Sequence, residues 1–345
     1  MCIVFILNNK PLYNSSSSSS QHDIDCGGSS SSGSNSHNNG GIPFIILNNR
    51  DEVFARPTQR LNKWVLGDNS RSSDTSGGAG SAGEDHDNNS SSSNNNNNID
   101  IYAGRDLKFG GTWFGINNYG SFAILLNYTV PKELISPDLK SRGLIIPEFL
   151  KHPSSELKDY IETMQKEKHL YPPLNLVVGN VKTGEIYYIC NYNKSDNNNN
   201  MNDTTTEAII LGDQVVTVSN GNVNDKWPKM KVGELLLQEY FDNLNNNLNP
   251  NQQGYDINNI PLDGLWNILS NNQKPDLSDI PKVGLEETFA KQCSSVFVEE
   301  APINGTNYGT RTSSILIVDN QFKARFIEKD YVNPGITDIT FQLDQ

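Results

Sequence analysis

Residues 1 to 7 read MCIVFIL, so a cysteine stands directly before a run of aliphatic and aromatic side chains. A short apolar run of this kind predicts a buried strand that begins at Ile3. If Met1 is removed, Cys2 presents a thiol and a free α-amine on one Cα atom. That amine has a reference pKa of about 7.7 to 8.0, so it can take the thiol proton near neutral pH. The stretch therefore predicts a nucleophile with its own base; the structural alternative is a small cysteine that fills a strand end.

Further short apolar runs follow along the chain and predict more strands. They lie at 42–47, 113–116, 122–126, 174–178, 186–190, 215–218, 296–298, 315–318 and 324–327. Turn residues at 117–120, 182–184 and 319–321 separate neighbouring runs, which indicates antiparallel hairpins. This pattern disfavours a doubly wound parallel sheet.

Helical periodicity marks another set of segments. They lie at 143–151, 155–166, 226–241 and 262–270. Each has one apolar face that must be buried against a partner layer. We therefore predict an α+β fold in which helices pack outside two mostly antiparallel sheets.

Polar tracts rich in Ser and Asn interrupt these patterns, at 13–41, 69–98, 193–206 and 243–259. Such tracts cannot bury enough apolar surface to offset the conformational entropy lost on ordering. Each lies between segments with strand or helix character, so we expect disordered loops inserted at surface turns. The remainder, about 255 residues, suits one core. We therefore predict a single domain over residues 1–345.

Charge and composition exclude several classes of function. Lys and Arg total 27 against 40 Asp and Glu, a net charge of −13, which disfavours a nucleic-acid-binding surface. No stretch reaches the length of a membrane span, and residues 1 to 7 lack the basic leader of a signal peptide. The four cysteines are widely spaced, with no histidine at metal-ligand spacing. We expect a soluble intracellular protein with no nucleic-acid partner, no transmembrane segment and no metal site.

Arg50 and Asp51 follow the strand predicted at 42–47. An arginine near a thiol lowers the thiol pKa, and a carboxylate can hydrogen-bond an α-amine and orient it. Adjacent residues of a strand point to opposite faces, so we expect one of the two to be structural unless a bulge or turn intervenes. Solvated turn residues are the structural alternative for both.

Three polar residues further along are candidates for the same chemistry. Asn127 interrupts the apolar strand at 122–126, and Asn220 follows the strand at 215–218. Amide N–H groups there can stabilise a developing oxyanion, whereas a turn or a satisfied buried amide is the structural alternative. Arg311 precedes the strand at 315–318 and can hold a carboxylate or phosphate in a bidentate fork, or form a surface salt bridge.

The motifs that stand in order along the chain are Met1-Cys2, Asn49-Arg50-Asp51-Glu52, Arg56-Pro57, Gly110-Gly111-Thr112-Trp113, Asn127-Tyr128, Arg142-Gly143, Ser219-Asn220, Trp227 and Tyr308-Gly309-Thr310-Arg311-Thr312. Together they resemble the transport and Golgi organisation protein 2 family. The resemblance implies a four-layer αββα fold like that of N-terminal nucleophile hydrolases. It also implies a cytoplasmic protein, associated with the Golgi apparatus or mitochondria, that acts in Golgi organisation and protein secretion through haem, acyl-CoA or lipid handling.

A more distant resemblance is to the cysteine amidohydrolases that cleave linear amides. It implies Cys2 as nucleophile, Asn127 and Asn220 as oxyanion donors, and no cofactor. Arg50 would lie near the thiol and Arg311 would supply a steadying charge. Asp51 is the acid available to orient the amine, although two residues separate the corresponding Arg and Asp in those enzymes.

Two molecular activities remain open at this point. One is a cysteine hydrolase of an amide or thioester bond, and the other is a non-catalytic carrier of a small acyl or haem-like ligand. A scaffold for trafficking proteins would need no cavity chemistry. For haem, the histidines outside the predicted loops are His152 and His169, and the Cys2 thiolate is the alternative iron ligand.

Overall fold

The structure is a computed structural model that describes residues 1–8, 43–65, 99–131, 135–153, 156–192, 207–212, 214–246, 255–281, 285–303 and 305–344. The inserts predicted at 13–41, 69–98 and 193–206 lie outside these residues. The bounds predicted for the insert at 243–259 were too wide. Helix α3 (Pro228–Asn246) runs into that tract, and Leu244 and Ile257 are buried. Isolated apolar residues at the edges of the tract pack into the core. The polar composition of the tract as a whole gave no indication of this.

Seven strands of the described chain form the first sheet, called sheet A, and all of its pairs are antiparallel. They are β1 (Ile3–Leu7), β2 (Phe44–Val53), β10 (Val215–Val218), β11 (Ala301–Ile303), β12 (Thr306–Val318), β13 (Lys323–Asp330) and β14 (Gly335–Gln342). The order is β10-β1-β2-β12-β13-β14, and β11 pairs with β12. The strand predicted at 296–298 is wrong, because those residues form no strand, although Val296 and Val298 are buried.

The second sheet, called sheet B, runs in sequence order and contains the seven other strands of the described chain. They are β3 (Thr58–Val65), β4 (Asp100–Asp106), β5 (Phe114–Asn117), β6 (Ser121–Asn127), β7 (Leu174–Asn180), β8 (Glu185–Cys190) and β9 (Ile209–Ile210). The predicted hairpins are confirmed, since β5 and β6, β7 and β8, and β12 and β13 pair antiparallel across the turns.

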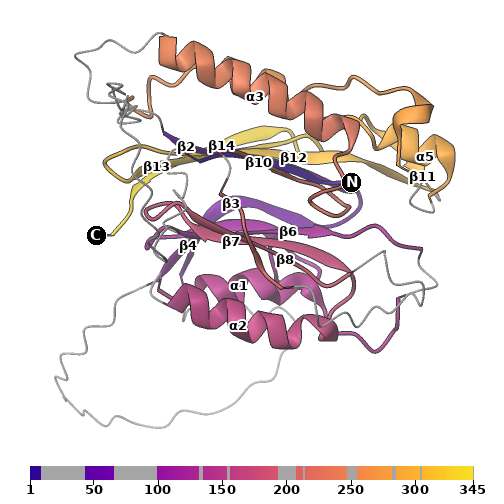
Figure 1. The fold of residues 1–345 in the computed structure, drawn as a ribbon, viewed down its shortest axis with the longest axis horizontal. Coiled ribbons are helices and arrows are strands. Elements are labelled where there is room, and N and C mark those ends of the chain that lie inside the picture. The colour runs from indigo at the N-terminus through magenta and orange to yellow at the C-terminus, as the bar shows by residue number, and fades with distance from the viewer. Residues whose placement is uncertain are drawn as a thin grey trace, which may run out of the picture.

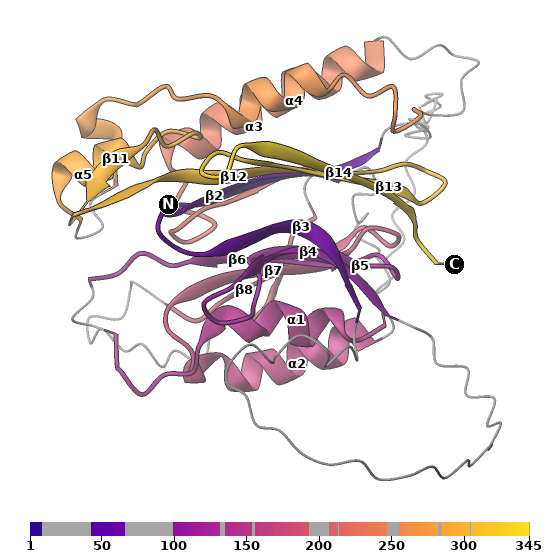
Figure 2. The ribbon, with the colours of Figure 1, turned by 180° about the vertical axis from the view of Figure 1, so that it is seen from behind.

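Helices cover the outer face of each sheet (Figures 1 and 2). Helix α3, α4 (Leu262–Leu269) and α5 (Glu287–Gln292) lie on sheet A, and α1 (Ile145–Leu150) and α2 (Leu157–Glu167) lie on sheet B. The predicted α+β class with αββα layers is confirmed. The sequence patterns predicted α1 to α4 but not the short α5.

Strand β1 contributes to two cores at once, which explains its unbroken apolar sequence. Val4 and Ile6 pack between the two sheets, whereas Ile3, Phe5 and Leu7 pack against the helices. Helix α3 approaches β1 closely at Gly233, where an added Cβ would lie 2.1 Å from the Phe5 ring. This fixed position of β1 also fixes Met1 and Cys2 at its amino end.

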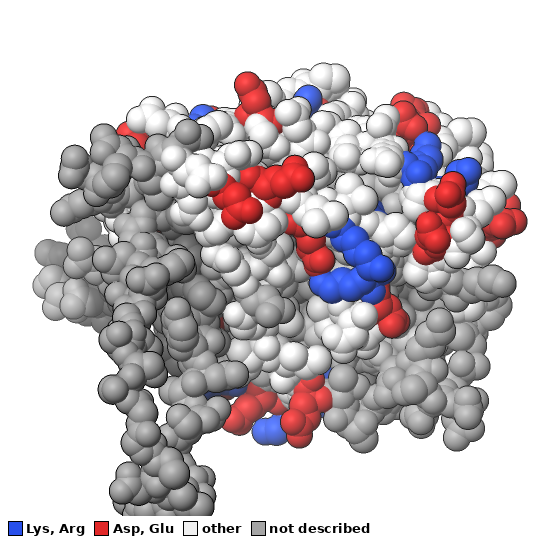
Figure 3. Space-filling model, turned by 45° about the horizontal axis from the view of Figure 1, so that its top comes forward, with Lys and Arg blue, Asp and Glu red and all other residues white. Residues whose placement is uncertain are grey.

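No helix in the described part of the chain is long and apolar enough to cross a membrane. Figure 3 shows acidic and basic side chains interspersed over one face of the molecule. The described residues on that face form no continuous basic surface, in keeping with the net charge of −13.

Candidate functional site

Cys2 lies half-buried at the start of β1, with its sulfur against the main chain of Asp51 on β2. The thiol donates to the Asp51 carbonyl at 3.7 Å and accepts from the Asp51 N–H at 3.4 Å. Burial and the Asp51 carboxylate raise the pKa of Cys2 above its ordinary value, and the nearby α-ammonium and Arg50 only partly offset this. With Met1 in place, the thiol is therefore protonated at neutral pH.

The Asp51 side chain points away from the thiol and binds the first residue of the chain. Its Oδ2 lies 3.0 Å from the Met1 ammonium, and its Oδ1 accepts a hydrogen bond from Thr310 Oγ1 at 2.6 Å. The Met1 ammonium also donates to the Tyr308 hydroxyl. Met1 belongs to the core between sheet A and its helices, whereas Cys2 packs on the core between the sheets. The acid predicted to orient an α-amine thus does contact one, that of Met1.

Arg50 points to the other face, as strand alternation predicts. Its guanidinium carbon lies 4.1 Å from the centroid of the Trp113 ring, and Nη2 lies 3.5 Å from a Glu52 carboxylate oxygen. Burial lowers the pKa of Arg50, and Glu52 partly restores it. The guanidinium stays charged at neutral pH, because arginine side chains are not deprotonated in proteins.

A cavity of about 360 Å³ opens beside the Cys2 sulfur. Its lining includes Cys2, Arg50, Asp51, Trp113, Asn127 and Arg142. Four of the six residues predicted for the site therefore line one cavity. Asn220 and Arg311 are not among its described lining residues.

Asn127 lines this cavity, and Asn220 is hydrogen-bonded to it. Asn220 Nδ2 donates to the Asn127 carbonyl at 2.6 Å, and Asn220 O accepts from the Thr129 N–H at 2.8 Å. The Asn127 side chain is exposed rather than buried, because Asn127 is the last residue of β6. Ser219 Oγ donates to the Cys2 carbonyl at 2.8 Å, which ties this loop to the thiol.

Asn175 on β7 holds the loop in place. Its Nδ2 donates to the carbonyls of Ser219 at 2.7 Å and Gly221 at 2.8 Å, and its Oδ1 accepts from the Tyr188 hydroxyl at 2.7 Å. All three hydrogen bonds are buried, so the position of Asn220 is set by sheet B.

Arg311 lies inside the fold and makes no surface salt bridge. It sits at an irregularity of β12, where the pairing with β2 shifts register between Thr310 and Thr312. The side chain is 2% exposed and donates to the Phe54 carbonyl. Its Nε is buried without a hydrogen-bond partner among the described residues. The charge of Arg311 contributes to the lowered pKa of Arg50, so Arg311 adds positive potential at that guanidinium.

A sequence profile of the Transport and Golgi organisation 2 family matches residues 33–80 and 84–333. The chain belongs to this family. The mouse Transport and Golgi organization 2 homolog is 24% identical over 294 residues, which cover 84% of this chain and 87% of the mouse protein. The human homolog is 23% identical over 298 residues, 85% of this chain and 88% of the human protein.

Among solved structures, a C2A mutant of conjugated bile acid hydrolase from Clostridium perfringens aligns with a TM-score of 0.41 at 10% identity. The alignment covers 88% of this chain and 90% of the hydrolase.

In the Asn49-Arg50-Asp51-Glu52 motif, the first residue has a structural role and the other three line the cavity. Asn49 Nδ2 donates to the carbonyls of Leu269 at 2.8 Å and Val296 at 2.9 Å, which joins β2 to the helical layer. Arg50, Asp51 and Glu52 line the cavity. In this member of the Transport and Golgi organisation 2 family, the motif thus links the cavity wall to the outer helices.

Sequence reasoning missed Lys229, which touches the Met1-Cys2 peptide. Its Nζ donates to the Met1 carbonyl at 2.8 Å and to the Cys293 carbonyl at 3.2 Å, and burial lowers its pKa. The sequence did contain a signal for this lysine. It shares the buried stripe of α3 with residues 233, 237 and 241, which follow at helical spacing. A lysine on such a stripe needs internal partners.

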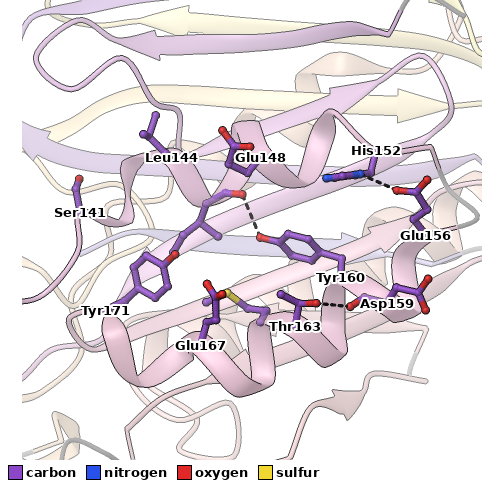
Figure 4. Close-up of a pocket in the computed structure, with 12 residues that line it drawn as sticks. Ser141, Leu144, Glu148, His152, Glu156, Asp159, Tyr160, Thr163, Glu167 and Tyr171 are labelled. Atoms are coloured by element: carbon purple, nitrogen blue, oxygen red, sulfur yellow. Dashed lines mark hydrogen bonds and ion pairs between the residues drawn. The ribbon is translucent and has the colours of Figure 1, made fainter.

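A second cavity, of about 430 Å³, lies between α1 and α2 on the far side of sheet B (Figure 4). Its lining includes a His152–Glu156 pair at 2.6 Å and the Tyr160 hydroxyl, which donates to the Ile145 carbonyl at 3.1 Å. It lacks a cysteine, so the cavity beside Cys2 is the better candidate for thiol chemistry. The described residues contain no cluster of metal-binding side chains, and neither His152 nor His169 lines the Cys2 cavity.

Proposed function

We propose that this member of the Transport and Golgi organisation 2 family hydrolyses an amide or thioester bond, with Cys2 as nucleophile after removal of Met1. The observation that carries the proposal is the placement of the Cys2 sulfur in a cavity walled by Arg50, Asn127 and Arg142. Such a set supplies a nucleophile, positive charge and an amide donor within one space.

Removal of Met1 is central to this proposal. It would leave a free α-amine on Cys2, one residue from the ammonium that Asp51 now binds at 3.0 Å. In its neutral form that amine would take the thiol proton, and the thiolate would attack the acyl carbon. The amide of Asn127 would donate to the resulting oxyanion. The α-ammonium would pass this proton to the leaving amine or thiol, and water would then hydrolyse the acyl-cysteine.

A second candidate, a carrier for an acyl or haem-like ligand, is favoured by the raised pKa of Cys2. If Met1 stays, the thiol is neutral and the cavity can bind a ligand without turning it over. For either activity, we infer a cellular role in Golgi organisation and secretion from the family to which the chain belongs.

The test combines intact mass with turnover of acyl-amide and acyl-thioester probes by the full chain. A hydrolase is expected to lack Met1, to turn over a probe and to lose that turnover in Cys2→Ala. Cys190→Ala is the matched control, because that buried thiol does not line the cavity. Turnover that survives in Cys2→Ala would refute the nucleophile.

Saturable binding of haemin or acyl-CoA without turnover would favour the carrier. In cells that lack the protein, delayed secretory transport is expected, and wild type should restore it. Rescue by Cys2→Ala as well would separate the cellular role from hydrolysis.

A further inference from the structure

Arg142 lines the same cavity as Cys2 and is the first residue of a short 3-10 helix, Arg142–Leu144. Its Nη1 donates to the Pro173 carbonyl at 2.6 Å. No ion pair joins it to a carboxylate of the described residues. The remaining N–H groups of this half-buried guanidinium are therefore available to a ligand in the cavity.

The other arginines of the cavity are already engaged. Arg56 forms a two-point pair with Asp106, with Nη2 to Oδ2 at 2.6 Å and Nε to Oδ1 at 3.1 Å. Arg50 lies on Trp113 and near Glu52. The Asp51 carboxylate is bound by the Met1 ammonium. The positive charge without a partner in the cavity is thus concentrated at Arg142, with the exposed Lys140 beside it at the rim.

The Arg142 segment is held rigidly against the cavity wall. An added Cβ on Gly111 would lie 1.8 Å from the Gly143 carbonyl oxygen, so two main-chain segments touch there. Burial lowers the pKa of Arg142 to about 10, and the ionised form of Cys2 and the Glu52 carboxylate act in the opposite sense. The guanidinium remains charged at neutral pH while it has lost part of its hydration, which strengthens its attraction for an anion.

We propose that Arg142 binds an anionic group of the ligand, a carboxylate or phosphate, next to the Cys2 sulfur. If the proposed hydrolysis holds, this anion site restricts the substrates to amides or thioesters that carry a carboxylate or phosphate close to the scissile bond. The anion site itself does not depend on turnover, because it needs only the cavity and the free guanidinium edge.

The test compares alkylation of Cys2 by iodoacetate, an anion, with alkylation by the neutral iodoacetamide, read by peptide mass. Arg142→Gln is expected to lower the ratio of the iodoacetate rate to the iodoacetamide rate about tenfold, from the loss of one close charge. Lys140→Gln removes the same charge from an exposed side chain and should change the ratio less than about twofold. An unchanged ratio in Arg142→Gln, or an equal change in both variants, would overturn the proposal.

Thermal melting supplies a second measurement for the case that Cys2 reacts with neither reagent. Hexanoate or hexyl phosphate should raise the melting temperature of wild type more than hexanamide does, and the arm that responds identifies the anion. Arg142→Gln should remove the difference. Equal shifts from all three compounds in wild type would count against the anion site, whereas loss of hydrolysis alone would leave it standing.

Discussion

The Met1 ammonium lies 3.0 Å from Asp51 Oδ2 on the helical side of sheet A, while the Cys2 thiol meets the main chain of the same aspartate from the other side. One β2 residue therefore contacts both functional groups that an N-terminal nucleophile requires. Strand alternation keeps them on separate faces as long as Met1 is present.

Asp51→Asn should destabilise the protein by about 3 kcal/mol, because it leaves a buried ammonium without its carboxylate. Urea unfolding measures this, with intact mass to establish which residue carries the ammonium. Glu52→Gln is the control, since the Glu52 side chain is 28% exposed and should cost under about 1 kcal/mol. Equal losses in the two variants would show that the ammonium pair contributes little.

Arg50→Met should slow alkylation of Cys2 by iodoacetamide. The Arg50 charge is one of the influences that lower the thiol pKa, so its removal moves the pH–rate profile to higher pH. Because Arg50 is the smallest of these influences, the rate below the midpoint should fall by less than about tenfold. Arg50→Lys should restore part of the rate, and a profile in Arg50→Met that overlays wild type would contradict the electrostatic role.

Asn175→Leu should destabilise the protein by about 2 to 3 kcal/mol and lower any probe turnover, because two buried carbonyls lose their donor and Asn220 shifts. Tyr188→Phe removes the third hydrogen bond of Asn175 together with the contacts of that hydroxyl to Cys190 and Val223, but it leaves both carbonyls their donor. It should cost about 1 kcal/mol without an effect on turnover. Urea unfolding and initial rates measure both. If Tyr188→Phe lowered turnover as much as Asn175→Leu does, the hydrogen bonds from Asn175 to the Ser219 and Gly221 carbonyls would not explain the effect.

Glu328→Gln should make the protein more stable, and increasingly so as pH rises. Burial between the sheets raises the pKa of Glu328 to about 7, and neighbouring Arg50 only partly opposes this. Between the unfolded pKa near 4.5 and the folded value, the native state binds more protons, so wild-type stability falls as pH increases. The advantage of the variant should therefore grow by about 2 kcal/mol from about pH 5.5 to pH 8.

Denaturant unfolding at the two pH values measures this difference. Gln can still accept the hydrogen bond that the Leu61 N–H now donates to Glu328 at 2.8 Å. The exposed Glu148→Gln serves as control and should show no such growth. A constant difference between Glu328→Gln and wild type across pH would mean that Glu328 is ionised throughout.

Local patterns were sufficient where the chain has a long apolar run or clear helical periodicity. β1 was predicted from its apolar run because it lies between two other strands and between two cores. β3 and β14 were missed because they are edge strands, in which polar residues alternate with few buried ones. Sequence spacing cannot mark such strands when water faces one side. β4 was missed although it is an interior strand, because its apolar run is only Ile101-Tyr102-Ala103.

The candidate site shows the same division. The motif around Arg50 was predictable, and strand alternation correctly required Arg50 and Asp51 to diverge. Arg142 was recognised as part of a motif but not as a site residue. Its position depends on the Pro173 segment, which packs against it only in the folded chain. Arg311 was predicted either to hold an anion at the site or to form a surface salt bridge, whereas the β12 irregularity places it inside the fold.

The enclosure of Met1 orders events during biosynthesis. Its ammonium and carbonyl are both bound inside the fold, and the residue is only 6% exposed. If Met1 is removed as proposed, we therefore expect an aminopeptidase to act on the nascent chain, before the sheet closes around this residue. A chain that folded first would keep its methionine for as long as it stayed folded.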